Sequence, residues 1–353
     1  MKNLEKYLSL LGTEVDGLLL TSRYSRHYGA EFDIAEGVAI VTAKGCRYYT
    51  DSRYIESAQN GIQGFEVVCV DGIGYNKLLN QAIEDFGVKT LGFEEVYLTV
   101  AELMNYEKNL SAKLVPFNEK IAAFRGVKEE WELENMRKAQ SIADKAFAEV
   151  LPRIQVGMSE LELQAELIYC MYKNGAHGLS FDPIVVSGPN TSMPHGVAGE
   201  RKIQPGDFIT MDFGTLYNGY CSDMTRTVAV GFVTEEMEKV YNTVLEAQQA
   251  GLAITKAGAI GKDIDGAARK VITDAGYGPY FGHGYGHSLG LEIHESPSPS
   301  ARNDQPMPLH AVASAEPGIY LPGKFGVRIE DSVIYTADGY ENLCTSPKNL
   351  IIL

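Results

Sequence analysis

The chain has 353 residues, of which 45% are hydrophobic and 22% are charged, and its formal net charge is −15 at pH 7. This length accommodates two domains of ordinary size, and this composition is typical of a folded soluble protein. The negative charge argues against partners such as nucleic acid or an anionic membrane, because both require a basic surface.

Charges such as Glu5 and Lys6 interrupt the apolar residues near the start, so we expect neither a signal peptide nor a membrane span. The five cysteines are scattered, odd in number and without a CxxC pair. This pattern indicates reduced, mostly buried thiols, and we therefore expect a cytoplasmic protein.

Strands and helices are predicted to alternate over the first part of the chain, which we assign to an α/β domain at 1–124. Apolar residues between Leu4 and Leu11 recur at helical spacing and predict an opening helix. Further along this domain, strands are expected at 17–20, 38–41, 65–70 and 90–93, and helices at 52–59, 75–86 and 100–110.

The domain boundary is placed near Phe124, ahead of a long amphipathic helix, and residues 125–353 are predicted to form an α+β domain. Ser159 and Glu162 have the capping-box spacing, so a second helix is expected to begin there. The expected helices are 128–151, 159–174, 235–255 and 262–275, packed on an antiparallel sheet of strands at 184–187, 208–214, 221–231, 328–336 and 350–353.

The segment MDFGTLYNGYCSDMTRT (211–227) is predicted to form a hairpin, because two β-like runs flank an Asn-Gly turn. Asp212 and Asp223 are equidistant from a turn centred on 217–218, so they are expected to face each other across the ladder. A turn centred one residue later would offset them slightly. Facing carboxylates repel unless they share a metal ion; the alternative is that both point to solvent or pair with Arg226.

A glycine-rich segment, FGHGYGHSLGLEIHE (281–295), contains His283, His287 and His294 among four glycines. Glycine lets a backbone approach a metal or substrate closely, and imidazole is the commonest nitrogen ligand. A lone histidine is more often a satisfied core residue, so this segment by itself is only moderately specific.

Two glutamates complete the candidate set. Glu316 precedes Pro-Gly, which imposes a turn, and Glu330 lies in the predicted strand GVRIEDSVIY (326–335). Side chains alternate along a strand, so Arg328 and Glu330 are expected to share one face. Arg328 is therefore a plausible hydrogen-bonding partner for this site.

Four carboxylates and one imidazole that converge in a fold require counter-cations, because like charges at close range strongly raise carboxyl pKa values. Two divalent metal ions sharing bridging carboxylates are the simplest solution, and such a pair activates a water molecule. The residues therefore indicate a dinuclear metallohydrolase with the ligands Asp212, Asp223, His287, Glu316 and Glu330.

The ordered segments SGPNTSMPHG, MDFG…CSDMTRT, GHGYGHSLGLEIHE, EPGIY and GVRIEDS closely resemble the pita-bread metallopeptidases. This group comprises aminopeptidase P, prolidase and methionine aminopeptidase. The resemblance covers about 125–353, and the preceding part resembles the creatinase/prolidase N-terminal domain through weaker motifs. It implies that Asp212 chelates one metal ion and that Asp223 and Glu330 bridge the two.

The resemblance also implies roles for residues around the metal ions. His287 and Glu316 bind the second ion. As our own mechanistic hypothesis, Glu316 also carries a proton to the leaving proline nitrogen. His195 in MPHG is expected to hold the peptide and the tetrahedral intermediate, and His294 to donate a proton or hydrogen bond near the scissile group. His283 matches a histidine of the substrate pocket, and we also expect Arg328, on the same strand face as Glu330, to bind substrate.

Two departures from the family pattern bear on the substrate. Where relatives often have Gly-Met and, two residues before the glutamate, a threonine, this chain has His310-Ala311 and Ser314. Where many prolidases place an arginine that grips the free carboxylate of a dipeptide, it has Ser298, and Arg302 is the nearest candidate. The second departure favours longer peptides.

The resemblance therefore implies hydrolysis of the Xaa–Pro bond in peptides with proline at the second position, by an aminopeptidase P-like enzyme that forms a homodimer. A set of four carboxylates and one histidine favours manganese, with cobalt, iron and zinc as alternatives. The main alternative activity is that of an Xaa-Pro dipeptidase (prolidase). Methionine aminopeptidases usually lack the N-terminal domain, creatinase-like enzymes dispense with the metal set, and a non-enzymatic pita-bread binding protein usually loses its ligands.

Overall fold

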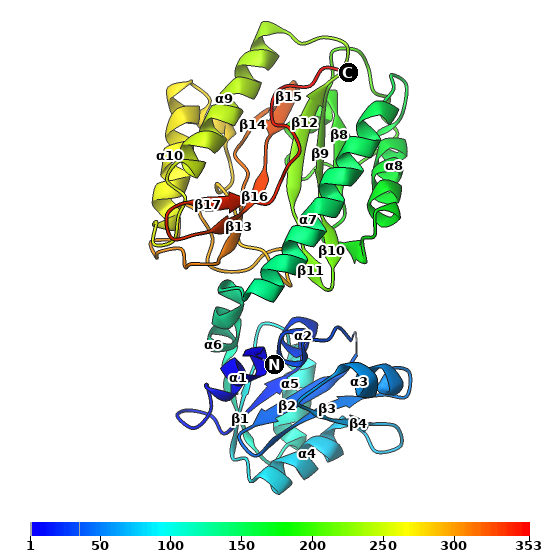
Figure 1. Cartoon of the computed structure of the whole chain (residues 1–353), viewed down its shortest axis with the longest axis vertical. Coiled ribbons are helices and arrows are strands. Elements are labelled where there is room, and N and C mark those ends of the chain that lie inside the picture. The colour runs from blue at the N-terminus through cyan, green and yellow to red at the C-terminus, as the bar shows by residue number, and fades with distance from the viewer. Residues whose placement is uncertain (1, 35) are drawn as a thin grey trace. The chain divides into compact units, whose positions relative to one another are not determined.

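The computed structural model describes residues 2–34 and 36–353, and the chain divides into two compact units, Met1–Arg125 and Gly126–Leu353 (Figure 1). Within the described ranges, no helix combines the length and apolarity that crossing a membrane requires. The fold classes predicted from the sequence, α/β for the first unit and α+β for the second, are confirmed.

The N-terminal unit is built on a six-stranded mixed sheet in the order β4-β3-β2-β1-β5-β6. Its strands are β1 (Gly17–Leu20), β2 (Val38–Thr42), β3 (Gly45–Thr50), β4 (Glu66–Cys69), β5 (Thr90–Phe93) and β6 (Lys113–Pro116). Its helices are α1 (Lys2–Leu8), α2 (Arg23–Ala30), α3 (Ile55–Gly61), α4 (Tyr75–Phe86), α5 (Val100–Asn109) and α6 (Asn118–Ala123). Sequence analysis did not find α2, β3, β6 or α6.

Helices cover both faces of this sheet because the side chains of β1 alternate between two apolar layers. Leu19 packs into a buried cluster with Leu79 of α4 and Tyr106 of α5. Leu20 points the other way, close to Gly29 of α2, which also contacts Tyr7 of α1. The N-terminal unit is thus a three-layer α/β domain.

The C-terminal unit surrounds several short antiparallel ladders with four long helices. The helices are α7 (Glu130–Val150), α8 (Glu160–Lys173), α9 (Glu235–Leu252) and α10 (Gly261–Asp274). The strands are β7 (Gly178–Leu179), β8 (Ile184–Ser187), β9 (Phe208–Phe213), β10 (Thr215–Tyr217), β11 (Tyr220–Cys221), β12 (Met224–Ala229), β13 (Val312–Ala315), β14 (Gly318–Leu321), β15 (Phe325–Arg328), β16 (Asp331–Tyr335) and β17 (Tyr340–Asn342). Short 3₁₀ turns lie at Phe124–Gly126, Leu151–Arg153, Gly188–Ser192 and Gly278–Tyr280.

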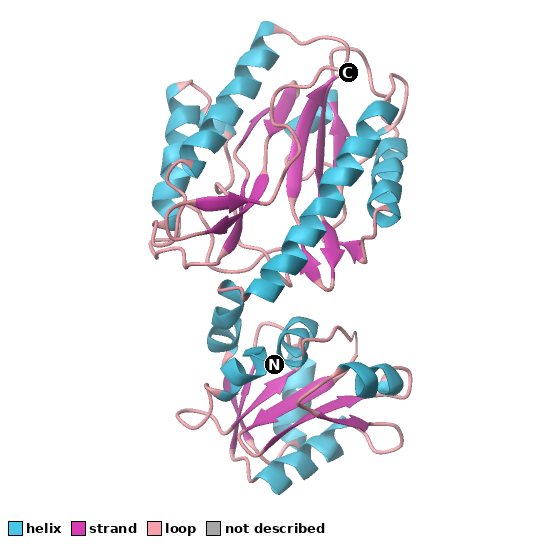
Figure 2. Cartoon of the chain, in the orientation of Figure 1, coloured by secondary structure: helices cyan, strands magenta, loops and turns pink. Residues whose placement is uncertain are grey.

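Two hydrophobic clusters hold these helices on the strands. Side chains of α7 and α8 pack on β8, β9 and β12, and side chains of α9 and α10 pack on β13 to β16. In Figures 1 and 2, α9 and α10 lie side by side at one edge of the unit and α8 lies at the other, while α7 runs obliquely across the unit toward α8, with most of the strands between α7 and α9. The ladders are β12-β9-β8, β11-β10-β7, β13-β16-β17 and β14-β15.

The predicted hairpin exists, but its turn is centred one residue later than expected. Tyr217 pairs with Tyr220 around Asn218 and Gly219, whose φ values are +48° and +80°, as a tight I′-type turn requires. This shift changes the register by two residues, so the residue opposite Asp212 is Thr225 rather than an aspartate. The prediction of two directly facing aspartates was therefore wrong, and the anticipated offset is what occurs.

Two predicted strands also need correction. The segment 328–336 is not one strand, because β15 ends at Arg328, β16 begins at Asp331, and the two belong to different ladders. The terminal segment 350–353 makes only an isolated bridge, from Ile352 to Ala229. In both cases the apolar alternation predicted a strand, and contacts with distant segments determined where regular pairing ends.

Candidate metal centre

All nine residues that the sequence singled out line one cavity of about 690 Å³ in the C-terminal unit. They are His195, Asp212, Asp223, His283, His287, His294, Glu316, Arg328 and Glu330. The same cavity is lined by apolar residues such as Phe181, Ile184 and Ile293. Polar groups therefore converge in a largely apolar pocket, which is the usual arrangement of a ligand site.

The hairpin brings Asp212 and Asp223 to the cavity. Asp212 lies on β9, the middle strand of its ladder, and Asp223 lies just before β12. In the observed register Asp223 falls opposite Gly214, where a Cβ would stand 1.9 Å from the carbonyl oxygen of Ser222. Only glycine allows the two chains to approach this closely, so Gly214 helps to set the position of Asp223.

Strand β13 positions His287 and Glu316 together. The Ser314 amide donates to the His287 carbonyl at 2.8 Å, and the Glu316 amide donates to the Tyr285 carbonyl at 2.8 Å. The Ser314 hydroxyl accepts from the His287 amide at 3.0 Å and donates to Glu316 Oε1 at 3.0 Å. Ser314, which departs from the threonine of the family pattern, thus still supplies a hydroxyl that connects both candidate ligands.

Glu330 reaches the cavity from the irregular stretch between β15 and β16. Its amide donates to the Thr225 carbonyl at 3.1 Å, and its Oε2 accepts from the Thr225 hydroxyl at 2.7 Å. Glu330 and Thr225 are 1% and 0% exposed, so this hydrogen bond holds a carboxylate that has almost no access to solvent.

Asp223, His287 and Glu330 each offer one possible ligand atom, and these three atoms all lie within 4.8 Å of one another. Glu316 Oε1 is 3.2 Å, and Asp223 Oδ2 is 3.4 Å, from His287 Nε2. His287 Nδ1 lies 3.3 Å from the Ser288 carbonyl, an arrangement that places the ring proton on Nδ1 and the lone pair on Nε2. A lone pair facing two carboxylate oxygens requires a cation or a proton between them.

Buried carboxylate oxygens without a hydrogen-bond partner mark the same place. Among the described residues, Oδ1 of Asp212, Oδ1 of Asp223 and Oε1 of Glu330 have none. A buried charge without a partner is costly, and metal coordination is the common way in which proteins satisfy it. The donor set and its unsatisfied oxygens therefore fit divalent metal ions.

Electrostatics lead to the same conclusion. Burial raises the pKa of Asp223 well above its usual range, and the nearby Glu330, Asp212 and Glu316 raise it further. Burial first, and the neighbouring carboxylates second, likewise raise the pKa of Glu330. Burial also raises the pKa of Glu316 and lowers that of His287, so each group is biased toward its neutral form when no cation is present.

A second chain of contacts runs through Arg328, which is buried and bonded on several sides. Its Nη2 donates to Asp212 Oδ2 at 2.6 Å, and its Nη1 donates to the Tyr320 hydroxyl at 2.8 Å. The Tyr320 oxygen lies 2.9 Å from His283 Nε2, and burial raises the pKa of Tyr320 to about 12. Arg328 thus connects a candidate metal ligand to the pocket histidine His283.

His195 and His294 are the two histidines with exposed side chains at the cavity. The ring of His294 lies 4.4 Å from that of His287, centroid to centroid, and burial together with this neighbour lowers the pKa of His294. Ser298 lines the cavity, whereas the exposed Arg302 does not.

Sequence reasoning missed two residues of the site, Thr225 and Tyr320. Thr225 could have been found from the sequence, because it lies two residues after Asp223 and therefore on the same face of an extended chain. Tyr320 stands in the AEPGIY segment, but its contact with Arg328 comes from the pairing of β14 with β15, which periodicity does not reveal.

The sequence model of metallopeptidase family M24 matches residues 134–337, and that of the creatinase/prolidase N-terminal domain matches residues 1–127. A solved Xaa-Pro dipeptidase from Bacillus anthracis is 42% identical, with 100% of this chain and 99% of that chain covered and a TM-score of 0.96. The X-Pro aminopeptidase from Thermotoga maritima is 37% identical, with 99% of each chain covered and a TM-score of 0.93. The Xaa-Pro dipeptidase of Pyrococcus furiosus is 39% identical over 279 residues, or 75% of this chain and 80% of that protein.

These matches include both domains and confirm the resemblance to pita-bread metallopeptidases that the sequence segments indicated. Enzymes of this class use divalent metal ions, for which the cavity offers a fitting donor set. The chain therefore belongs to metallopeptidase family M24, as a two-domain metallopeptidase with a creatinase/prolidase N-terminal domain.

Proposed function

We propose that this metallopeptidase hydrolyses the Xaa–Pro bond at the N-terminus of peptides, with two divalent metal ions held by Asp212, Asp223, His287, Glu316 and Glu330. The observation that carries the proposal is the cluster of Asp223, His287 and Glu330, whose possible ligand atoms lie within 4.8 Å of one another, together with three buried carboxylate oxygens of Asp212, Asp223 and Glu330 that have no hydrogen-bond partner. Two bound ions would supply an activated water molecule and would polarise the scissile carbonyl.

The remaining residues supply binding and proton transfer. Glu316 has a raised pKa and a hydroxyl neighbour, so it is suited to take a proton and deliver it to the leaving proline nitrogen. His195 lines the cavity with an exposed ring, free to donate a hydrogen bond to the oxyanion. His294, whose lowered pKa keeps it neutral near pH 7, offers a second donor near the scissile group.

Substrate length is inferred from the charges in the cavity. A dipeptide presents a free carboxylate close to the scissile bond, and binding it requires a cation that is not already paired. Of the described residues that line the cavity, Arg328 carries the only guanidinium, and it is bonded to Asp212 and Tyr320. Ser298 stands in the cavity wall instead of an arginine, which favours longer peptides and the aminopeptidase P type.

Prolidase activity is the second candidate function. It is favoured by relatives that are named Xaa-Pro dipeptidase and that are 39% and 42% identical to this chain. If it is correct, the carboxylate of the dipeptide must be bound by hydroxyl groups such as those of Ser298 and Ser300, or by a cation outside this cavity.

The deciding experiment compares hydrolysis of an Xaa-Pro dipeptide with that of the matched Xaa-Pro-Yaa tripeptide by Mn²⁺-loaded protein, with a chelator control. We expect the tripeptide to be cleaved with the higher kcat/KM. Faster dipeptide cleavage would establish the prolidase type, and activity that survives the chelator would contradict the metal mechanism itself.

Two variants separate the proposed roles. Asp212→Ala removes a ligand and is expected to abolish turnover together with metal binding. His195→Ala is expected to slow turnover while the metal content measured by elemental analysis stays that of the wild type. Loss of metal from His195→Ala would instead make this residue a ligand.

Manganese is proposed as the metal because four carboxylates and one histidine form an oxygen-rich donor set. A cytoplasmic location is supported by the five cysteines, which all lie in the described part of the chain as free thiols. The proposed homodimer is tested by analytical ultracentrifugation of the intact chain, for which we expect twice the monomer mass.

A further inference from the structure

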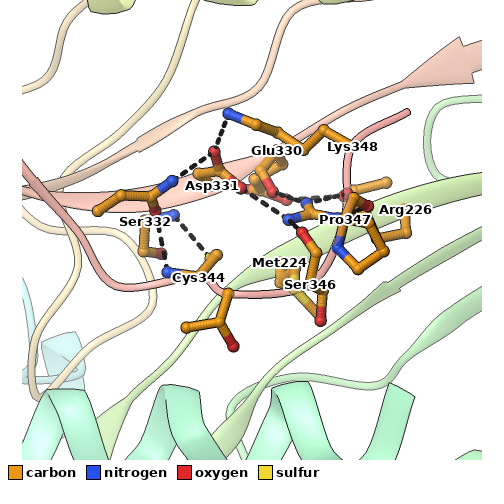
Figure 3. Close-up of polar contacts among 12 residues, drawn as sticks. Met224, Arg226, Glu330, Asp331, Ser332, Cys344, Ser346, Pro347 and Lys348 are labelled. Atoms are coloured by element: carbon orange, nitrogen blue, oxygen red, sulfur yellow. Dashed lines mark hydrogen bonds and ion pairs between the residues drawn. The ribbon is translucent and has the colours of Figure 1, made fainter. Parts of the chain in front are cut away.

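Arg226 lies next to Thr225 on β12 but points away from the cavity, since successive side chains of a strand face opposite sides. Arg226 is 1% exposed, and an arginine has five N–H donors. All five are used: they donate to the carbonyl oxygens of Thr225, Glu330, Ser346 and Pro347 and to Oδ1 of Asp331. Figure 3 shows this arrangement.

Asp331, the residue after Glu330, supplies a negative charge that pairs with the Arg226 guanidinium on the core side of β12. It is 0% exposed, and its Oδ1 accepts from Arg226 Nη2 at 2.8 Å. Its Oδ2 accepts from Asn342 Nδ2 at 2.9 Å and from the Lys348 ammonium group. We call Arg226, Asp331, Asn342 and Lys348 the Arg226 network; in Figure 3, Lys348 and Arg226 approach Asp331 from different directions.

The Arg226 network contacts the backbone of one candidate metal ligand, and a neighbouring hydroxyl contacts another. Arg226 Nη1 donates to the carbonyl of Glu330, which lies in the irregular stretch between β15 and β16, outside any regular strand ladder. The Ser332 hydroxyl donates to the carbonyl of Asp223 at 2.8 Å. The two residues proposed to bridge the metal ions are thus both held from behind.

The last part of the chain is bound into the same structure. Arg226 reaches the carbonyls of Ser346 and Pro347 at 2.8 and 3.1 Å. On the other side of this segment, Asp144 of α7 accepts from the amides of Thr345 and Ser346 at 3.0 and 2.9 Å. The segment 342–348 therefore lies between α7 and Arg226 and closes the network.

We propose that Arg226 is a positioning residue for the metal centre: with Asp331 and the segment 342–348, it fixes the backbone of Glu330 so that the carboxylate is held in place before metal binds. The proposal rests on the metal-binding function proposed above. Lysine cannot replace Arg226, because an ammonium group has three donors and lacks the planar geometry that lets a guanidinium donate to five acceptors at once.

The physical reason lies in preorganisation. A ligand carboxylate that is already held in place loses little freedom when metal binds, and removing the groups that hold a ligand typically weakens metal affinity about 10- to 100-fold. Without Arg226, the Glu330 carbonyl would lose this donor, and only the hydrogen bond from the Glu330 amide to the Thr225 carbonyl would hold the backbone of Glu330 from β12. Metal affinity therefore depends on a residue that never touches the metal.

The test compares Arg226→Lys with a matched control, Arg201→Lys. Arg201 also makes a two-pronged ion pair, with Asp207 at 2.6 and 2.9 Å, and its guanidinium otherwise bonds to Ser187 and Lys202, which are not proposed ligands. Chelator-stripped proteins are titrated with Mn²⁺ by calorimetry, and EPR distinguishes two exchange-coupled ions from a single uncoupled one. Circular dichroism establishes that each variant is folded.

We expect wild-type protein and Arg201→Lys to bind two Mn²⁺ with the same affinity and to give the coupled spectrum. Arg226→Lys is expected to bind at least one ion roughly 10- to 100-fold more weakly and to give an uncoupled spectrum at the same Mn²⁺ concentration. Folded Arg226→Lys with wild-type affinity, or equal losses in both variants, would overturn the positioning role. Absence of Mn²⁺ binding by the wild type would instead refute the proposed function.

Ser332→Ala keeps the test decisive if Arg226→Lys does not fold. It removes one hydroxyl that holds the Asp223 carbonyl and leaves the charges of the core unchanged. We expect roughly 5-fold weaker Mn²⁺ binding, the equivalent of one lost hydrogen bond. Unchanged affinity in this variant would show that backbone support from behind the strand does not set metal binding.

Discussion

Glu330→Gln should stabilise the metal-free protein while it abolishes the stabilisation by Mn²⁺. The ligand atoms of Glu330 and Asp223 lie within 4.8 Å of each other. Two full charges at that distance repel by about 3.5 kcal/mol at an effective dielectric constant of about 20. Partial protonation relieves some of this repulsion in the wild type, so we expect the variant to gain about 1–3 kcal/mol at pH 8.

The sign of the pH dependence follows from the raised pKa values of Glu330 and Asp223. Between their unfolded and folded pKa values, the metal-free folded state binds more protons than the unfolded state. Its free energy of unfolding therefore falls as pH rises through the folded pKa values. The advantage of Glu330→Gln should accordingly be largest at pH 8 and should disappear below the unfolded pKa of a carboxyl group.

The assay is urea denaturation followed by the fluorescence of Trp131, the chain's single tryptophan, which lies on α7 and so reports on the C-terminal unit. Each protein is measured with chelator and with excess Mn²⁺, and Glu246→Gln, an exposed position on α9, serves as the control expected to change neither curve. The reasoning fails if Glu330→Gln is less stable than the wild type in chelator at pH 8, or if Mn²⁺ stabilises both proteins equally.

Three further predictions concern the surroundings of the cavity. Gly286→Ala should sharply reduce Mn²⁺ affinity in calorimetry, because its Cβ would stand 2.0 Å from a carbonyl oxygen of β13, whereas Gly282→Ala, with nothing within 4 Å, should not. His310→Gly should raise the free energy of unfolding by about 0.5–1 kcal/mol, because His310 has a φ of +63° that glycine adopts without strain. Lys128→Met should lower the free energy of unfolding by about 3–5 kcal/mol, because it removes the cation from a buried ion pair with Glu295. Adding Glu295→Gln to this variant should restore part of the loss in the same urea assay.

The candidate ligands could be singled out from sequence because residues such as Asp212 and Glu330 depart from what their local segments would otherwise favour. Asp212 interrupts the apolar strand FITMDFG, and Glu330 interrupts another apolar alternation. Burying an unpaired carboxylate is costly, so such positions indicate a compensating cation even before a fold is known. The convergence of all nine predicted residues on one cavity required the tertiary structure, but the residue types had already limited the chemistry.

Register and strand ends could not be obtained in this way. The alternation from Val327 to Val333 continues without interruption in the sequence, yet the chain leaves one ladder at Arg328 and enters another at Asp331. The break depends on contacts from a strand about 100 residues earlier, including those of Thr225 and Arg226 with Glu330. Local periodicity contains no information about such partners, and so it gave the correct faces but the wrong extent of the strand.

The alternation of side chains also explains how Thr225 with Arg226, and Glu330 with Asp331, can leave oxygens available at the cavity and yet satisfy the buried charges on the core side. Glu330 lines the cavity and is bonded to Thr225, and its Oε1 is without a hydrogen-bond partner, so this oxygen stays available to a metal ion. Arg226 and Asp331, their immediate neighbours, face the core, where every N–H of the guanidinium is bonded. Satisfied groups on one face can hold unsatisfied groups on the other because consecutive side chains share a backbone. Changes on the core face should therefore alter metal affinity before they alter the chemistry of the cavity.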